Sequence, residues 1–201
     1  VDTALNTIAY NVDKIRDTAS SHSRIFVIEV MGRHCGYLAL NSAISCGALA
    51  VLMPELEEQF EPEVFCNLIY KAFRRSKKHA IIIKAEGFTL HSDEEIKSML
   101  SGYMGERGIE KISMRFTNLG HIQRGGSPTS FDRILASKMG LHAVRQLLAG
   151  QSNVMMGLVQ NRIVTSPLED CTLGKEERVM ALYEEYMRQE VLMSKKLTPP
   201  V

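Results

Sequence analysis

The stretch that decides the fold is Leu119-Gly120-His121-Ile122-Gln123-Arg124-Gly125-Gly126-Ser127-Pro128-Thr129-Ser130-Phe131-Asp132-Arg133. It follows an extended segment, residues 112–118, and leads into a helical segment that ends near Gly150. The glycines let a ligand approach the backbone closely, and Arg124 offers a planar fork of donors that suits phosphate. His121 lies in the same short loop, so both side chains can reach one anionic group. A strand, a basic glycine-rich loop and a helix N-terminus together predict an anion site.

Composition limits the classes of protein to which this chain can belong. Its 201 residues, 45% of them hydrophobic, allow one domain, or one domain and part of another. The formal net charge of +1 gives no global field to attract nucleic acid or a membrane, and no apolar run approaches the ~20 residues of a membrane helix. Four scattered cysteines without a CxxC pair indicate reduced thiols and a cytoplasmic protein. Because the chain opens with Val1 rather than Met, we expect a piece of a longer polypeptide.

Hydrophobic periodicity predicts strands that alternate with helices. Apolar residues recur at helical spacing over residues 3–20, and the β-branched run at residues 25–30 is typical of a buried parallel strand. The same patterns predict further helices at 37–45, 62–75, 92–104, 131–148 and 174–190, and further strands at 49–53, 79–85, 112–118, 154–159 and 162–165. This alternation predicts an α/β fold, with a parallel sheet that is covered by helices on both faces.

Three loops that follow predicted strands carry the polar chemistry. They are residues 31–36, Glu86-Gly87 and residues 120–126, and sheets of this kind bind ligands at the carboxyl ends of their strands. Arg33 and His34 precede Gly36 at a helix start, which suits phosphate, with a plain tight turn as the alternative. The Glu86 carboxylate accepts hydrogen bonds from hydroxyls and so suits a sugar, with a structural ion pair as the alternative. The residues therefore predict a site for a phosphorylated, hydroxyl-rich small molecule, without a protein nucleophile or a metal cluster.

Two charged runs have competing interpretations. The basic run at residues 74–79 is either a second anion site or a solvated face. The five glutamates within residues 55–63 we interpret as a solvated surface.

Two longer motifs resemble the signature stretches of the 6-phosphofructokinase family. They are Ile28-Glu29-Val30-Met31-Gly32-Arg33-His34-Cys35-Gly36 and Gly120-His121-Ile122-Gln123-Arg124-Gly125-Gly126-Ser127-Pro128, the second followed by Phe131-Asp132-Arg133. Their order and approximate spacing match the family over nearly the whole chain, and Asp2-Thr3-Ala4-Leu5-Asn6-Thr7 matches at the start. The resemblance implies a parallel-sheet, three-layer α/β sandwich of the phosphofructokinase type. This sandwich would be incomplete, because the N-terminal nucleotide-binding part is missing.

The resemblance also implies that the chain has two parts and that the catalytic residues of the family lie outside it. Residues 1–122 would form a fructose 6-phosphate-binding domain. Residues 123–201 would be return segments that pack on the missing nucleotide-binding domain, together with a C-terminal helix. The family's catalytic aspartate and its magnesium-binding acid lie upstream, so the resemblance implies no catalytic and no metal-binding residue in this chain. The helix at residues 131–148 would then expose an apolar face.

Residue by residue, the resemblance implies two sites. The substrate-binding residues are Arg24, Met31, Gly32, Arg33, Glu86, Arg115, His121 and Arg124. Of these, Arg24 and Arg115 would reach into the site of a neighbouring subunit. The effector-binding residues are Arg16, Arg33, Arg75, Lys77, Lys78 and His79. Leu49 stands where the family usually has an acid near the effector phosphates and metal, and a leucine cannot ligate a metal.

The function that the resemblance implies is phosphotransfer in glycolysis. The full protein would bind ATP with Mg²⁺ and transfer the γ-phosphate to the 1-hydroxyl of fructose 6-phosphate, releasing ADP. It would be an allosteric, cytoplasmic homotetramer that binds neither nucleic acid nor a membrane. This chain would supply the sugar-phosphate site and would be inactive alone. Two alternatives stay open: a non-catalytic sugar-phosphate-binding regulatory module, and a phosphofructokinase that uses pyrophosphate.

Overall fold

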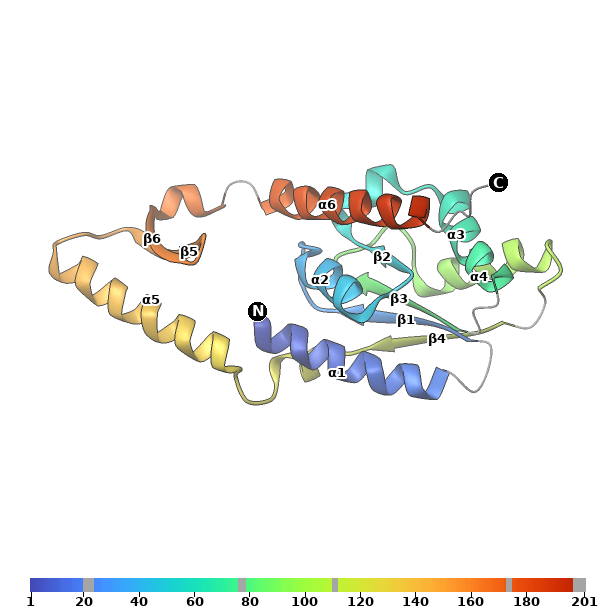
Figure 1. The fold of residues 1–201 in the computed structure, drawn as a ribbon, viewed down its shortest axis with the longest axis horizontal. Coiled ribbons are helices and arrows are strands. Elements are labelled where there is room, and N and C mark those ends of the chain that lie inside the picture. Colours follow the sequence, from blue (N-terminus) through green and yellow to red (C-terminus); the bar gives the residue numbers. More distant parts are fainter. Residues whose placement is uncertain (20–23, 76–78, 110–111, 173–174, 197–201) are drawn as a thin grey trace.

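The structure, a computed structural model, describes residues 1–19, 24–75, 79–109, 112–172 and 175–196 (Figure 1). A four-stranded sheet lies at its centre, and every neighbouring pair of strands is parallel, in the order β2-β3-β1-β4. The strands are β1 (Arg24–Val30), β2 (Ala50–Leu52), β3 (His79–Ala85) and β4 (Ser113–Asn118). The predicted α/β class and the predicted parallel strands are confirmed.

Helices cover both faces of this sheet, which makes three layers (Figure 1). One face carries α1 (Asp2–Ala19), α2 (Tyr37–Cys46) and α6 (Lys175–Lys196). The other face carries α3 (Pro62–Arg74) and α4 (Asp93–Gly105). The side chains of β1 and β3 alternate between two buried clusters: Ile28 and Ile83 enter the first, and Ile25 and Ile82 enter the second, all fully buried. Burial on both faces explains why these strands are apolar without alternation.

The register places the strand ends level with one another. Val30 of β1 lies opposite Ala85 of β3, and Glu29 lies opposite Asn118 of β4. Since all these strands run in the same direction, the loops that follow them begin at one edge of the sheet. This edge is where the predicted ligand loops meet.

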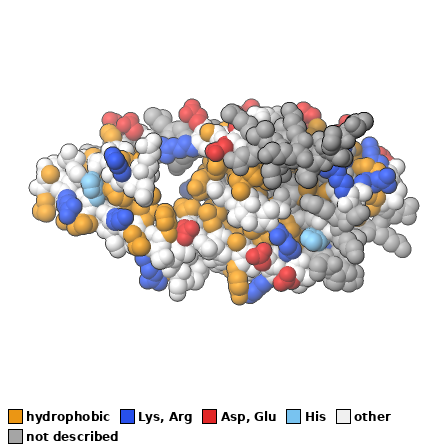
Figure 2. Space-filling view, in the orientation of Figure 1, with side chains coloured by type: hydrophobic (Ala, Val, Ile, Leu, Met, Phe, Trp, Pro, Cys, Tyr) orange, Lys and Arg blue, Asp and Glu red, His pale blue; other side chains and the backbone are white. Residues whose placement is uncertain are grey.

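The segment after β4 leaves the sheet (Figure 1). It consists of the 3-10 turn η2 (Gly120–Arg124), helix α5 (Ser130–Leu148), strands β5 (Val154–Val159) and β6 (Arg162–Pro167) and the 3-10 turn η3 (Leu168–Thr172). None of the described α5 residues is buried, and its Leu141 and Val144 are 55% and 54% exposed. Hydrophobic side chains accordingly lie at the surface of this outlying part (Figure 2). The expected exposure of apolar residues is confirmed, but these residues are spread around the helix and not confined to one face.

The prediction that strands and helices alternate throughout is wrong for β5 and β6. These two strands pair with each other in an antiparallel hairpin. Only Gln160 and Asn161 separate the paired residues Val159 and Arg162, and both have positive φ, 48° and 63°. Positive φ at both central residues is typical of the two-residue turn that matches the twist of a hairpin.

The prediction of a solvated acidic surface is wrong for two glutamates. Glu55, in the 3-10 turn η1 (Pro54–Gln59), accepts hydrogen bonds from the Gly36 amide at 2.8 and 3.1 Å. Glu57 accepts one from the Leu90 amide at 3.1 Å and another from the Thr89 amide. Because Gly36 is the N-cap of α2, a carboxylate of the chain itself occupies the helix terminus where the sequence suggested phosphate.

The start of α4 provides a direct test of local stability. Ser92 Oγ accepts a hydrogen bond from the Glu95 amide at 3.2 Å, and the Glu95 carboxylate accepts one from the Ser92 amide at 2.7 Å. The Ser92→Ala change removes half of this capping box and should lower the free energy of unfolding by about 1 kcal/mol. Ser101→Ala, at an exposed position of the same helix, should not lower the free energy of unfolding. Urea unfolding of both variants measures the difference, and equal midpoints would contradict the capping account.

Candidate functional site

Three loops meet at the carboxyl edge of the sheet, and backbone hydrogen bonds hold the start of two of them to β1. The Glu86 amide donates to the Val30 carbonyl at 2.9 Å, and the Leu119 amide donates to the Glu29 carbonyl at 3.1 Å. These bonds continue the parallel ladder one residue beyond the strands. The loops therefore begin from fixed positions beside one another, as the sequence predicts.

Glu86 holds the loop at residues 31–36 in place. Its Oε1 accepts a hydrogen bond from the Gly32 amide at 3.0 Å and another from the Arg33 amide. Arg33 has φ 55°, in the left-handed region that non-glycine residues rarely adopt. Gly87 allows this arrangement, because a Cβ at that position would lie 2.2 Å from the Arg33 carbonyl oxygen. The loop is thus held in an uncommon conformation by a carboxylate and by close backbone packing.

Gln123 joins this loop to the one after β4. Its side chain is 3% exposed. The Oε1 atom accepts a hydrogen bond from the Met31 amide at 3.1 Å, and Nε2 donates to the Gly120 carbonyl at 3.1 Å. Both ends of a buried amide are therefore satisfied, as burial requires. We call this pair of bonds the Gln123 latch; the sequence analysis did not assign Gln123 a role.

The short helix η2 places His121 and Arg124 on one side. Residues three apart eclipse each other in a 3-10 helix, which has three residues per turn. Both side chains are exposed, whereas Gln123 between them is buried. The two basic side chains therefore extend from the same face of the turn into solvent, and together they can donate hydrogen bonds to one anion.

The end of the loop is tied to α1. Thr129 caps α5 by accepting a hydrogen bond from the Asp132 amide at 3.3 Å. The Thr129 amide in turn donates to the Thr3 hydroxyl oxygen at 3.1 Å, and the Thr3 hydroxyl donates to Asp132 Oδ2 at 2.6 Å. Hydrogen bonds from Thr3 lower the pKa of the Asp132 carboxyl.

A charge network around the buried side chain of Lys84 lies next to the site. Lys84 Nζ lies 2.7 Å from Asp93 Oδ1 and 3.2 Å from Glu29 Oε2, and Asn118 Nδ2 donates to Glu29 Oε1. Burial alone would lower the pKa of Lys84, but the two carboxylates raise it above its usual value. The ammonium therefore stays charged and links the ends of β3, β1 and α4. In the sequence, Lys84 stands out as a single lysine within an apolar strand, but no role was predicted for it.

Two predicted substrate residues do not join this cluster. Arg24 is the first residue of β1, and Arg115 of β4 pairs with Phe26. Both therefore lie toward the amino ends of the strands, and the seven residues of β1 span roughly 20 Å. Neither residue can complete the site of its own chain, which agrees with the expectation that they act on a neighbour; that expectation stays a prediction.

The predicted effector residues lie mostly at this opposite edge. Arg16 lies in the last turn of α1, Arg75 follows α3 and His79 begins β3, while Lys77 and Lys78 lie outside the described residues. The structure separates Arg33 from them, because Arg33 belongs to the loops at the carboxyl edge. Arg16 donates to the Cys46 carbonyl at the end of α2, and Leu49 lines an apolar cavity.

In the part of the chain that the structure describes, no group of three or more histidine, cysteine or acidic residues is arranged to hold a metal ion. Among those same residues, no helix combines the length and the apolar character that a membrane span requires. All four cysteines are free thiols, as predicted, and burial raises the pKa of Cys66 to about 11.

The fold and the loops define a class: a layered α/β protein in which three loops bring basic side chains to the carboxyl edge of a parallel sheet, the edge at which such folds bind ligands. Residues 1–147 match the family model described as Phosphofructokinase. The chain belongs to the phosphofructokinase family.

Relatives and solved structures agree with this membership. The chain is 44% identical over 182 residues to the ATP-dependent 6-phosphofructokinase of Halothermothrix orenii, covering 89% of this chain and 54% of the relative. It is 47% identical over 167 residues to that of Lactococcus lactis subsp. lactis, covering 83% and 46%. A crystal structure of Pichia pastoris phosphofructokinase in the T-state matches with a TM-score of 0.75 and 34% identity, covering 90% of this chain and 20% of that one. The chain thus spans about half the length of the curated relatives it matches.

Gly87→Ala tests the close packing of the loops. The added methyl group would meet the Arg33 carbonyl and displace one of the loops, so the free energy of unfolding should fall by about 1–3 kcal/mol. Gly102→Ala is the matched control, since a Cβ there meets nothing within 4 Å; it should stabilise α4 by about 1 kcal/mol. Denaturant unfolding should therefore show a lower free energy of unfolding for Gly87→Ala and a higher one for Gly102→Ala. A Gly87→Ala variant as stable as the unaltered protein would show that the two loops are not in contact.

Proposed function

We propose that this chain is the sugar-phosphate-binding portion of an ATP-dependent 6-phosphofructokinase. The complete polypeptide would transfer the γ-phosphate of ATP to the 1-hydroxyl of fructose 6-phosphate. The observation that carries the proposal is the pairing of His121 and Arg124 on one face of η2, fixed beside the loop at residues 31–36 by the Gln123 latch. The names of the relatives support the reaction, and the two neighbouring basic side chains support a site for a phosphate ester.

Each loop would have its own part in holding the sugar. His121 and Arg124 would donate hydrogen bonds to the 6-phosphate and balance its charge. Glu86 would accept from sugar hydroxyls, and Met31, Gly32 and Arg33 would form the adjoining wall. Phosphoryl transfer depends mainly on positioning and on electrostatic stabilisation. A rigid set of loops at the fixed edge of a sheet suits that task.

The nucleotide and the catalytic base would come from residues outside this chain. In the described part, no acidic cluster fits Mg²⁺, so no step through the metal or through ATP is derived from these residues. The division into a sugar-binding domain at 1–122 and return segments at 123–201 belongs to the same proposal. The exposed apolar side chains of α5 support it, because burial against a further unit would remove them from water.

Two further elements of the proposal concern assembly and regulation. Arg24 and Arg115 would act in the site of a neighbouring subunit of a cytoplasmic homo-oligomer. Arg16, Arg75 and His79, together with Lys77 and Lys78, would bind a phosphorylated effector, with Arg33 outside this group. A non-catalytic sugar-phosphate-binding module is the second candidate, favoured by basic side chains at the carboxyl edge of the sheet that would bind a sugar phosphate without transferring a group to it.

Arg124→Ala in the complete polypeptide tests the phosphate contact. Losing a charge-assisted hydrogen bond should raise the KM for fructose 6-phosphate by about 10–100-fold, with a smaller change in kcat. Lys97→Ala, an exposed lysine on α4, is the control for removing a positive charge and should leave KM unchanged. Steady-state kinetics with the sugar varied would measure both constants. An unchanged KM for Arg124→Ala would contradict the assignment of the phosphate site.

Gln123→Met tests the latch, because methionine matches the shape of glutamine without its donor and acceptor. The Met31 amide and the Gly120 carbonyl would lose their partner, at a cost of about 1–3 kcal/mol in stability. Looser loops should also weaken sugar binding by about tenfold, whereas Ser92→Ala should cost stability without changing the KM for the sugar. If Gln123→Met lowers stability but leaves sugar KM intact, the latch does not position the site.

A further inference from the structure

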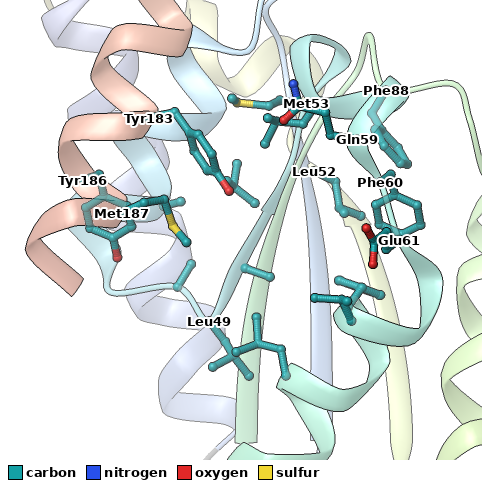
Figure 3. Close-up of a pocket in the computed structure, with 18 residues that line it drawn as sticks. Leu49, Leu52, Met53, Gln59, Phe60, Glu61, Phe88, Tyr183, Tyr186 and Met187 are labelled. Atoms are coloured by element: carbon teal, nitrogen blue, oxygen red, sulfur yellow. The ribbon is translucent and has the colours of Figure 1, made fainter. Parts of the chain in front are cut away.

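An apolar cavity lies along the free edge of β2, between α3 and α6 (Figure 3). Its volume is about 260 Å³, a little below the usual range for ligand cavities, so it would suit a small molecule. Since β2 ends the sheet, the layers above and below it continue past the sheet edge and enclose this space. The cavity is neither part of the sugar site nor used by the proposed reaction.

The walls of the cavity are mostly apolar and come from both faces of the sheet. Tyr183, Tyr186 and Met187 of α6 form one wall, and Val64 and Leu68 of α3 contribute to the opposite one. Val64 and Leu68 are 61% and 44% exposed although they lie beside this space. An apolar ligand seated here would therefore remove apolar surface from water, which favours binding.

One end of the cavity is aromatic and already ordered. The ring centroids of Phe60 and Phe65 lie 5.5 Å apart, and those of Phe60 and Phe88 lie 5.7 Å apart in an edge-to-face arrangement. Such contacts fix the rings before any ligand arrives. The faces of aromatic rings attract cations, most strongly where water is partly excluded.

The same end carries a negative charge. Among the described residues that line the cavity, Glu61 is the only one with a charged side chain, and its carboxylate lies beside the Phe60 ring (Figure 3). In the described structure this side chain does not cap α3, although Glu61 is the N-cap residue. Glu58 and Glu63 are exposed close to it in the sequence. The cavity therefore combines apolar walls with a carboxylate and aromatic rings at one end.

We propose that this cavity binds a small organic cation with an apolar body, such as an arylalkylammonium. The ammonium group lies between the Glu61 carboxylate and the Phe60 ring, and the apolar body lies along β2 between α6 and α3. Leu49 suits this site, because its apolar side chain lines the cavity and an acid there would be desolvated by the bound apolar body.

The test uses 2-phenylethylammonium as the probe and 2-phenylethanol as its uncharged analogue. Calorimetric titration of the complete polypeptide is expected to show that the amine binds with a Kd of about 1 mM. The alcohol is expected to bind more weakly. Glu61→Gln should weaken amine binding by about fivefold and leave alcohol binding unchanged. Glu63→Gln, an exposed glutamate that does not line the cavity, is the matched control and should change neither.

A second variant locates the probe. Val64→Arg places a positive charge on the exposed wall of the cavity and should abolish amine binding. Loss of binding in Val64→Arg with intact fructose 6-phosphate binding would support the site independently of the proposed enzyme activity. Equal affinity for amine and alcohol, or unchanged amine binding in Glu61→Gln or in Val64→Arg, would overturn the proposal. The last result would mean that the probe binds another apolar surface, such as α5.

Discussion

The buried amide of Gln123 is the contact on which the candidate site depends. It joins two loops that are 92 residues apart in the chain, and each of its two bonds reaches a backbone atom of a different loop. Inside a protein, an amide with both ends satisfied specifies one arrangement, because every alternative leaves a buried polar group without a partner. The exposure of His121 and Arg124 follows from this constraint, because burying Gln123 leaves its neighbours on the turn facing solvent.

The sheet makes this contact possible, and the charge network secures the sheet. The parallel register brings the ends of β1, β3 and β4 level, so three short loops suffice to build a site. Lys84 and Glu29 lie near the carboxyl ends of β3 and β1, and Asp93 is the first residue of α4. Their ion pairs lie where the apolar interior of the sheet meets its polar edge. Removing both carboxylates would leave the buried Lys84 ammonium without a partner, which is costly. The polar loops therefore lie next to a lysine that is paired on two sides.

Much of this architecture could be predicted from the sequence, because it follows from local pattern. The buried strands are recognisable from β-branched runs, and the loops from Gly120, His121 and Arg124 in one short motif. Other features depend on contacts that no local pattern records. Gln123 appeared only as part of a motif, and Glu55 and Glu57 resembled a solvated run until the structure placed backbone amides against them. The hairpin of β5 and β6 was missed for another reason: its two-residue turn lacks the glycine that usually marks one.

The central claim is that the three loops form one phosphate-ester site. The most direct test is a crystal structure of the complete polypeptide with fructose 6-phosphate bound. The account predicts the phosphate within hydrogen-bonding distance of both His121 and Arg124, with sugar hydroxyls at Glu86 and the Gln123 latch unchanged. A sugar phosphate bound elsewhere, or at these loops only after the bond between Gln123 and Met31 has broken, would contradict it.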